Sequence, residues 1–260
     1  MRMLRVVPEW SGFDAPKHMV CLAPLPQHLP ADDDALPPLV DSTEWLTFKT
    51  DKRRREHLGG RLLLGASIEG WWKERGFHGR TDELDVVRDE HRAPYLRWRP
   101  GLWRQAPLPG ASIGHSVGQA VVGLVDHGWS IGVDAEPLDR EIAEGAWDMF
   151  ASAEERASFQ GKPEAALRAW VTKEAVQKAL GLGMHLNPRH IVADGNRYLH
   201  EGAVVHLSWM NVDGMLMCVA LAPGRDPPST PEDDVLEATK AGMDANPDWG
   251  VGCKTTRNMS

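Results

Sequence analysis

The stretch WVTKEAVQKALG, Trp170 to Gly181, has the spacing of an amphipathic helix, yet it places charges on its apolar side. At about 100° per residue, one side of this helix collects the apolar residues Leu167, Trp170, Val171 and Leu182. Glu174 and Lys178 fall near the middle of the same side. Other positions were open to polar residues, and they hold Thr172, Lys173 and Gln177.

The two charges on the apolar side have a structural and a functional interpretation. As an exposed i,i+4 pair, Glu174 and Lys178 would contribute a few tenths of a kcal/mol, roughly. An exposed pair does not explain why charges stand within an apolar stripe. Burying a pair without further partners is unfavourable, because desolvation costs on the order of several kcal/mol. The pattern therefore favours a functional site at this helix.

A second acidic pair lies upstream in SIGVDAEPL, residues 130–138. Residues two apart on a strand point to the same face, so Asp134 and Glu136 project together. Two adjacent carboxylates repel each other unless a cation or a shared proton lies between them. Magnesium prefers such oxygen ligands, and Glu174 could complete the cluster. The alternative is an exposed strand end with two solvated acids.

Histidine and basic residues form the remaining candidates. In GASIGHS, residues 110–116, His115 stands among small residues that would allow close approach of a ligand; a structural histidine is the alternative. KTDKRRREHLGGR contains Lys52, and HRAPYLRWR contains Arg92 beside Pro94. Solvated helix charges explain most of the first run, whereas Arg92 in a loop could contact a phosphate.

Composition limits the class of protein. The 260 residues are 42% hydrophobic and 25% charged, with a net charge of −8, which argues against general nucleic-acid binding. The three cysteines lack zinc spacing and favour a reducing compartment. We find neither a run of about 20 apolar residues nor a signal-peptide pattern, and we expect a cytoplasmic protein without membrane contact.

The order of expected elements predicts an α+β chain. Expected helices span about 43–76, 141–151, 153–160 and 163–180. Expected strands are HMVCLAPL (residues 18–25), residues 82–87, two strands around a turn at 126–128 within 112–138, and short strands at 190–194, 196–201, 203–211 and 214–222. Residues 91–110 are expected to form a loop, and 224–260 a disordered, dispensable tail.

Together these motifs resemble a known family. IGVDAE (131–136) followed by WVTKEAVQKALGLG (170–183) resembles the paired signature of the surfactin-type (Sfp-type) phosphopantetheinyl transferases. SIGHS (112–116) resembles the family's histidine segment, and RREHLGGRLLL (54–64) its N-terminal helix. The resemblance covers about Thr43 to Ala222.

The resemblance implies a fold and a reaction. It implies two similar α/β subdomains related by a pseudo-twofold axis, residues 1–126 and 127–223, with the active site at their interface. It implies a monomeric, Mg²⁺-dependent enzyme that moves the 4′-phosphopantetheine arm of coenzyme A to a serine of an acyl or peptidyl carrier protein. Adenosine 3′,5′-bisphosphate is the other product. Fatty-acid, polyketide and nonribosomal-peptide carriers all fit.

The resemblance also implies residue roles. Asp134, Glu136 and Glu174 match the magnesium ligands, and Glu174 matches the residue that activates the serine. Lys178 matches a lysine that contacts the coenzyme A phosphates, and His115 a histidine on the pyrophosphate side. The basic positions that match phosphate contacts are Lys52, toward the adenosine 3′-phosphate, and Arg92.

Two positions depart from the family pattern. Ala93-Pro94 preceded by Arg92 replaces the common Gly-Lys-Pro and resembles the enterobactin-type branch. Gly114 replaces the usual Ser or Thr before the histidine. Two other functions stay open: a generic magnesium-dependent phosphotransferase or hydrolase, and a catalytically inactive module that binds coenzyme A or a carrier protein.

Overall fold

The computed structural model describes residues 2–31, 36–99 and 107–224, all within the first of two units, Met1–Arg225 and Asp226–Ser260. The strands are β1 (Leu4–Val6), β2 (His18–Pro24), β3 (Leu84–Arg88), β4 (Pro94–Trp98), β5 (Gly110–Ser116), β6 (Gln119–Val125), β7 (Trp129–Pro137), β8 (Arg197–His200), β9 (Ala203–Val212) and β10 (Met215–Pro223). The α-helices are α1 (Ser42–Thr47), α2 (Asp51–Glu74), α3 (Glu144–Phe150), α4 (Ala153–Phe159) and α5 (Pro163–Leu180). Short 3-10 turns cover Thr81–Glu83, Gly183–His185 and Pro188–His190.

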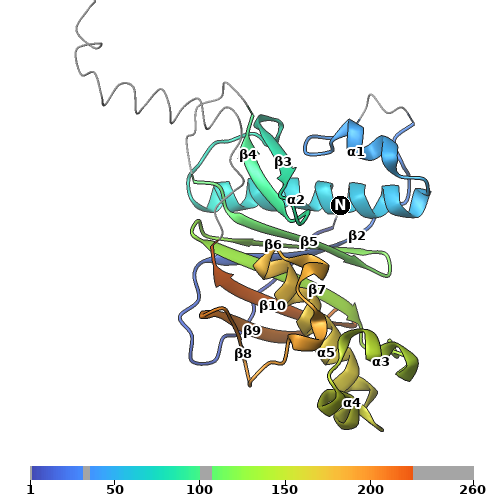
Figure 1. Cartoon of the computed structure of the whole chain (residues 1–260). Helices are drawn as coiled ribbons and strands as arrows, with labels where there is room; N and C mark the ends of the chain where they lie inside the picture. The colour runs from blue at the N-terminus through green and yellow to red at the C-terminus, as the bar shows by residue number, and fades with distance from the viewer. Residues whose placement is uncertain (1, 32–35, 100–106, 225–260) are drawn as a thin grey trace, which may run out of the picture. The chain divides into compact units, whose positions relative to one another are not determined.

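The first sheet is antiparallel in the order β1-β2-β6-β5, and α2 covers one of its faces (Figure 1). Successive side chains of β2 point to opposite faces of the sheet. Met19, Cys21 and Ala23 pack with α2, whereas Val20 and Leu22 pack with the second sheet. Both faces of the sheet are therefore buried, so β2 is a nearly continuous apolar run.

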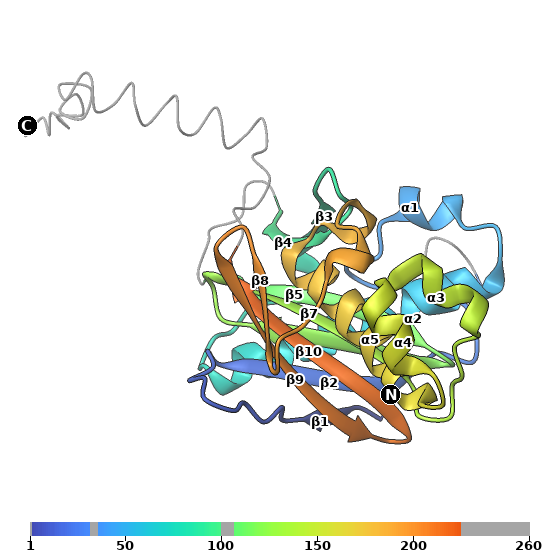
Figure 2. The ribbon, with the colours of Figure 1, turned by 60° about the horizontal axis from the view of Figure 1, so that its bottom comes forward.

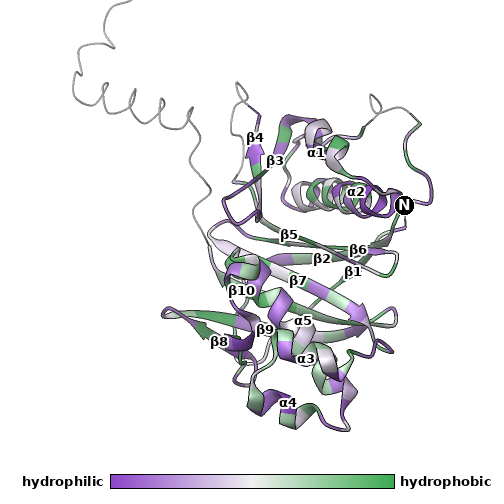
Figure 3. Ribbon diagram, turned by 45° about the vertical axis from the view of Figure 1, so that its right-hand side comes forward, coloured by the Kyte–Doolittle hydropathy of each residue, from purple (hydrophilic) through white to green (hydrophobic). Residues whose placement is uncertain are grey.

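The second sheet is antiparallel in the order β7-β10-β9-β8. Ile131, Val133 and Ala135 of β7 join the core between the two sheets. The alternate residues of β7 face α5, where the Ser130 hydroxyl donates to the Ala179 carbonyl oxygen. In Figure 3, purple bands interrupt the pale and green stretches of β7, which carries both apolar and polar residues. Helices α3 and α4 lie beside α5 (Figure 2).

Local signals account for the ends of the long helices. Pro163 occupies the first turn of α5, and Gly181 ends the helix at φ +67°. Thr50 caps α2 by accepting a hydrogen bond from the Arg53 amide. The same cap corrects the expected helix at 43–76, which is two helices, α1 and α2, because the chain is extended at Phe48 and Thr50.

The expected turn at 126–128 and the strands on either side of it are present, as β6 and β7, but these two strands do not pair as a hairpin. Residues 110–137 form three strands, and the hairpin joins β5 to β6 through Val117 and Gly118. The turn at 126–128 instead carries the chain from one sheet to the other. This point coincides with the predicted boundary between residues 1–126 and 127–223; the pseudo-twofold relation of the two parts stays a prediction.

Two smaller expectations need correction. Residues 94–98, expected as loop, form β4, which pairs with β3 and stacks Trp98 on Trp72 at 5.8 Å. The expected strand at 190–194 is a 3-10 turn followed by a single bridge from Asp194 to Arg197. The other expected helices and strands are present, so the α+β class is confirmed. The predicted tail lies outside the described residues, and no helix in the described ranges is long and apolar enough to cross a membrane.

Candidate active site

The acidic strand and the charged helix meet where the sheets adjoin. β5 is the edge of the first sheet, β7 is the edge of the second, and the Val133 amide donates to the Ser112 hydroxyl between them. Helix α5 lies directly on β7 at Gly132, where an added Cβ would lie 1.9 Å from the Ala175 carbonyl oxygen. Only glycine permits this approach, which brings the side chains of α5 to those of β7.

Lys178 links the two motifs. Its ammonium group donates to Asp134 Oδ1 at 2.7 Å and to the Val133 carbonyl oxygen at 3.1 Å. Burial lowers the pKa of Lys178, but the carboxylates of Asp134, Glu174 and Glu136 outweigh it, so the pKa lies above its ordinary value. Lys178 thus reaches across to the strand and stays charged among the three predicted acids.

The two strand acids are buried. Asp134 and Glu136 are each 8% exposed, so the alternative of two solvated acids is wrong. Burial raises the pKa of Asp134 to about 6 against the pull of Lys178. Glu136 accepts hydrogen bonds from the Ser116 hydroxyl and pairs with Arg140.

The polar positions on the other sides of α5 are also buried, which the helical wheel does not predict. Lys173 is 2% exposed, and its ammonium group donates to Glu155 and to the carbonyl oxygens of Pro188 and Ile191. The Gln177 amide donates to the Leu186 carbonyl oxygen. α4 and the segment 181–191 enclose Lys173, which therefore serves packing, whereas Gln177 also lines the cavity next to Lys178.

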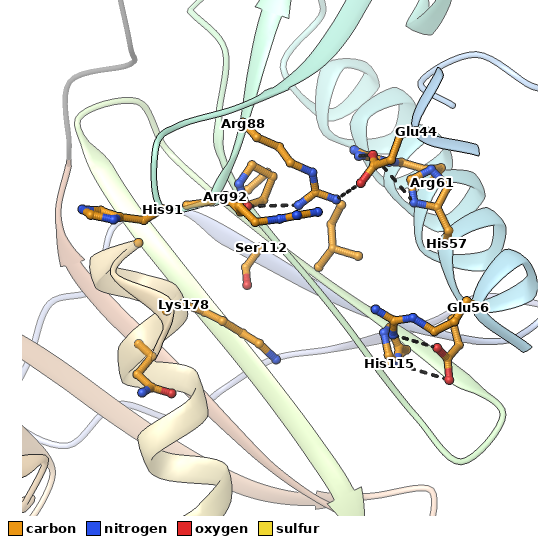
Figure 4. Close-up of a pocket in the computed structure, with 18 of the residues that line it drawn as sticks. Glu44, Glu56, His57, Arg61, Arg88, His91, Arg92, Ser112, His115 and Lys178 are labelled. Atoms are coloured by element: carbon orange, nitrogen blue, oxygen red, sulfur yellow. Dashed lines mark hydrogen bonds and ion pairs between the residues drawn. The ribbon is translucent and has the colours of Figure 1, made fainter. Parts of the chain in front are cut away.

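A basic cavity of about 520 Å³ opens beside Lys178 (Figure 4). Its lining draws on α1, α2, the β3–β4 loop, β5 and α5. The charged and imidazole side chains in it are Glu44, Arg53, Glu56, His57, Arg61, Arg88, His91, Arg92, His115 and Lys178. Five of these are cationic Arg or Lys and two are carboxylates, so the cavity suits an anionic ligand.

His115 stands at the cavity wall as predicted. Its Nδ1 lies 3.7 Å from a Glu56 carboxylate oxygen, and Glu56 also accepts from Arg53 at 3.1 Å. Burial lowers the pKa of His115 despite Glu56, so the imidazole is neutral at pH 7. Gly114, the residue before His115, leaves room for the Lys178 side chain, because a Cβ on residue 114 would lie only 3.3 Å from Lys178 Nζ.

The two predicted basic positions differ in placement. Arg92 lines the cavity with φ at +67°, in a loop that the Asp89 carboxylate holds by accepting from the amides of His91 and Ala93. Lys52 is 84% exposed and lies 3.9 Å from Glu56, and its neighbour Arg53 lines the cavity instead. The role of Lys52 as a phosphate contact stays a prediction.

Sequence reasoning missed several lining residues, above all Glu44, Arg61 and Arg88. Arg61 lies in RREHLGGRLLL, where a cation among apolar residues on a helix was a usable signal. Arg88 and Glu44 come from a strand end and a separate short helix, and neither shows a local pattern that predicts a shared site.

The acids fit a hard cation in their chemistry. All three offer carboxylate oxygens, and the buried Asp134 Oδ2 has no hydrogen-bond partner among the described residues. Within those residues, no three His, Cys, Asp or Glu side chains converge as a ligand set, and Lys178 and Arg140 pair with Asp134 and Glu136. Asp134, Glu136 and Glu174 as magnesium ligands stay a prediction.

An α+β fold with buried acids beside a basic cavity defines a protein suited to a phosphate-bearing ligand. Residues 130–200 match the family model described as the 4′-phosphopantetheinyl transferase superfamily. This match includes Asp134, Glu136, Glu174 and Lys178, and it confirms the resemblance. It supports a transferase that moves phosphopantetheine. No curated protein matches the chain at a significant level.

Proposed function

We propose that this protein transfers the 4′-phosphopantetheine arm of coenzyme A to a serine of an acyl or peptidyl carrier protein. The observation that carries the proposal is the contact between Lys178 and Asp134, which unites the two halves of the family signature beside the basic cavity. Coenzyme A presents a pyrophosphate and a 3′-phosphate, and a cavity with a cationic excess complements them.

The cavity residues support binding and orientation of the pyrophosphate. Lys178 and Arg92 supply positive charge, and neutral His115 supplies one N–H donor. Mg²⁺ bound by Asp134, Glu136 and Glu174 would neutralise charge on the phosphate oxygens. Together these residues would orient the phosphorus atom next to pantetheine for attack by an incoming hydroxyl.

The transfer step needs a base for the serine. The serine Oγ attacks that phosphorus, and the bond to the leaving phosphate oxygen breaks. Glu174 takes the serine proton, directly or through water. The products are the phosphopantetheinyl carrier and adenosine 3′,5′-bisphosphate, whose new charge the cavity cations offset.

Mass spectrometry of apo carrier proteins incubated with the chain, coenzyme A and Mg²⁺ tests the proposal. We expect the carrier to gain the mass of the arm at one serine, and no gain in EDTA. E174Q should lose rate while it keeps coenzyme A binding, and K178A should lose affinity as well. Glu164 is an exposed residue at the start of the same helix, so E164Q is the matched control. Coenzyme A binding without transfer to acyl or peptidyl carriers would favour the inactive binding module.

A further inference from the structure

One carboxylate holds two arginines at the end of the cavity next to α1 and α2 (Figure 4). Glu44 Oε1 accepts from Arg88 Nη2 at 2.7 Å, and Glu44 Oε2 lies 3.4 Å from Arg61 Nη2. Arg88 is fixed a second time, because its Nη1 donates to the Arg92 carbonyl oxygen at 3.0 Å. Glu44 therefore joins α1, α2 and the end of β3.

This group carries an excess of positive charge. Burial raises the pKa of Glu44, but Arg88 and Arg61 outweigh it, so the pKa lies below its ordinary value and the carboxylate is ionised. Burial and the neighbouring Arg88 lower the pKa of Arg61 to about 10, which still leaves it protonated at pH 7. Burial lowers the pKa of His57 to about 4, so that imidazole is neutral. Two guanidinium groups share one carboxylate, so these three side chains carry one more positive than negative charge, and Asp41 is a further acid whose charge acts on Arg61.

The same group also has unused donors. Arg61 is 3% exposed, and its Nη1 has no hydrogen-bond partner in the described part of the chain. Buried donors without partners are costly, and an anionic group that entered this end of the cavity would satisfy them.

We propose that Glu44 is a positioning residue, whose carboxylate bridges Arg61 and Arg88 and holds both guanidinium groups ready for a phosphate group of the substrate. The inference rests on the proposed function, since coenzyme A is the phosphate ester that it takes as ligand. Glu44 itself acts through the arginines. Trp45, the next residue, is 2% exposed and anchors α1, so the carboxylate is presented from a fixed backbone.

An opposite role would change affinity in the opposite direction. If Glu44 only competed with the ligand for the arginines, its neutralisation would strengthen coenzyme A binding. If Glu44 positions the arginines, E44Q should weaken coenzyme A binding, because the glutamine oxygen can accept from one arginine while its NH₂ group faces the other. Arg61 and Arg88 then repel each other without a bridge, and neither is held in place.

Calorimetric titration of the full chain with coenzyme A, beside transfer kinetics, tests the role. E44Q should weaken coenzyme A binding about tenfold, the factor that one charge-assisted hydrogen bond supplies. It should raise KM for coenzyme A while kcat at saturation stays near the wild-type value. The matched control is D85N, because Asp85 pairs with Arg99 on the same β3–β4 hairpin and does not line the cavity. D85N should bind like wild type.

A double-mutant cycle separates positioning from a general loss of stability. In the R88M background, E44Q should cost less than it does in wild type, because one of its two targets is gone. Repeating the cycle with 3′-dephospho-coenzyme A identifies the phosphate: a penalty that vanishes assigns the 3′-phosphate, and one that persists assigns the pyrophosphate. Both results support the inference.

Four results would overturn it. Tighter binding by E44Q would make Glu44 a competitor of the ligand. Equal binding by E44Q and wild type, or additive losses in the cycle, would leave it no role in positioning. A wild-type chain that does not bind coenzyme A would overturn the proposed function together with the inference, and that result differs from the others because the wild type itself fails.

Discussion

Replacing Gly132 by alanine should separate α5 from β7 and thereby disrupt the candidate active site. A Cβ at this position would lie 1.9 Å from the Ala175 carbonyl oxygen and 2.5 Å from the Ala179 amide nitrogen, and real Cβ atoms essentially never come within 3.0 Å. The helix must therefore retreat by about 1 Å, the difference between those distances. Backbone atoms form the contact, so no rotamer change relieves it.

The retreat has two expected costs. Overpacking of this kind lowers the free energy of unfolding by about 1–3 kcal/mol. Displacement of Lys178 and Glu174 from Asp134 by about 1 Å should reduce the transfer rate by up to about a hundredfold. Urea denaturation measures the first cost, and single-turnover modification of a carrier measures the second.

Gly145 provides the matched control. It lies in α3, and a Cβ there would meet no atom within 4 Å. Alanine at this position should leave the rate unchanged and raise stability by up to about 1 kcal/mol, the difference in helix propensity. A G132A chain with the stability and rate of wild type would refute the argument that α5 rests on the bare backbone of β7.

Three further predictions concern charges. Asp134→Ala should abolish carrier modification and retain the fold, because it removes Oδ2, which has no partner among the described residues, and because Lys178, which loses its bond to Oδ1, keeps the Val133 carbonyl oxygen as an acceptor; circular dichroism and mass spectrometry check both parts, and activity in this variant would contradict the metal assignment. Lys173→Met should lower the free energy of unfolding by about 3–5 kcal/mol, since it takes the cation away from the Glu155 carboxylate and removes one donor each from the Pro188 and Ile191 carbonyl oxygens, whereas Lys52→Met, at an exposed position, should change it little in the same urea titration. Burial and Arg61 depress the pKa of His57 from 6.5 to about 4, so between these pH values the imidazole is protonated in the unfolded chain and neutral in the folded chain. The free energy of unfolding should therefore fall by up to about 3 kcal/mol as the pH drops from 6.5 toward 4. His57→Gln should flatten that part of the plot of stability against pH.

The sequence alone determined the features that depend on local spacing. Proline at the start and glycine at the end define α5, and short runs rich in apolar residues define β2, β9 and β10. The period of two on β7 and the charges on the apolar side of α5 predicted a common cluster, and Lys178 does bind Asp134. These features follow from backbone geometry within one element, which a single segment carries by itself.

Only the tertiary structure decided which elements are partners and what faces the cavity. β6 pairs with β5 instead of β7, because the hydrogen bonds of a sheet edge can be satisfied by any strand that the core brings alongside. Lys173 is more buried than Lys178, because α4 and a distant loop enclose its side of the helix. Glu44, Arg61 and Arg88 meet although up to 44 residues separate them in the chain. Such contacts depend on how several elements pack together, and the periodicity of residues within a single element does not predict that packing.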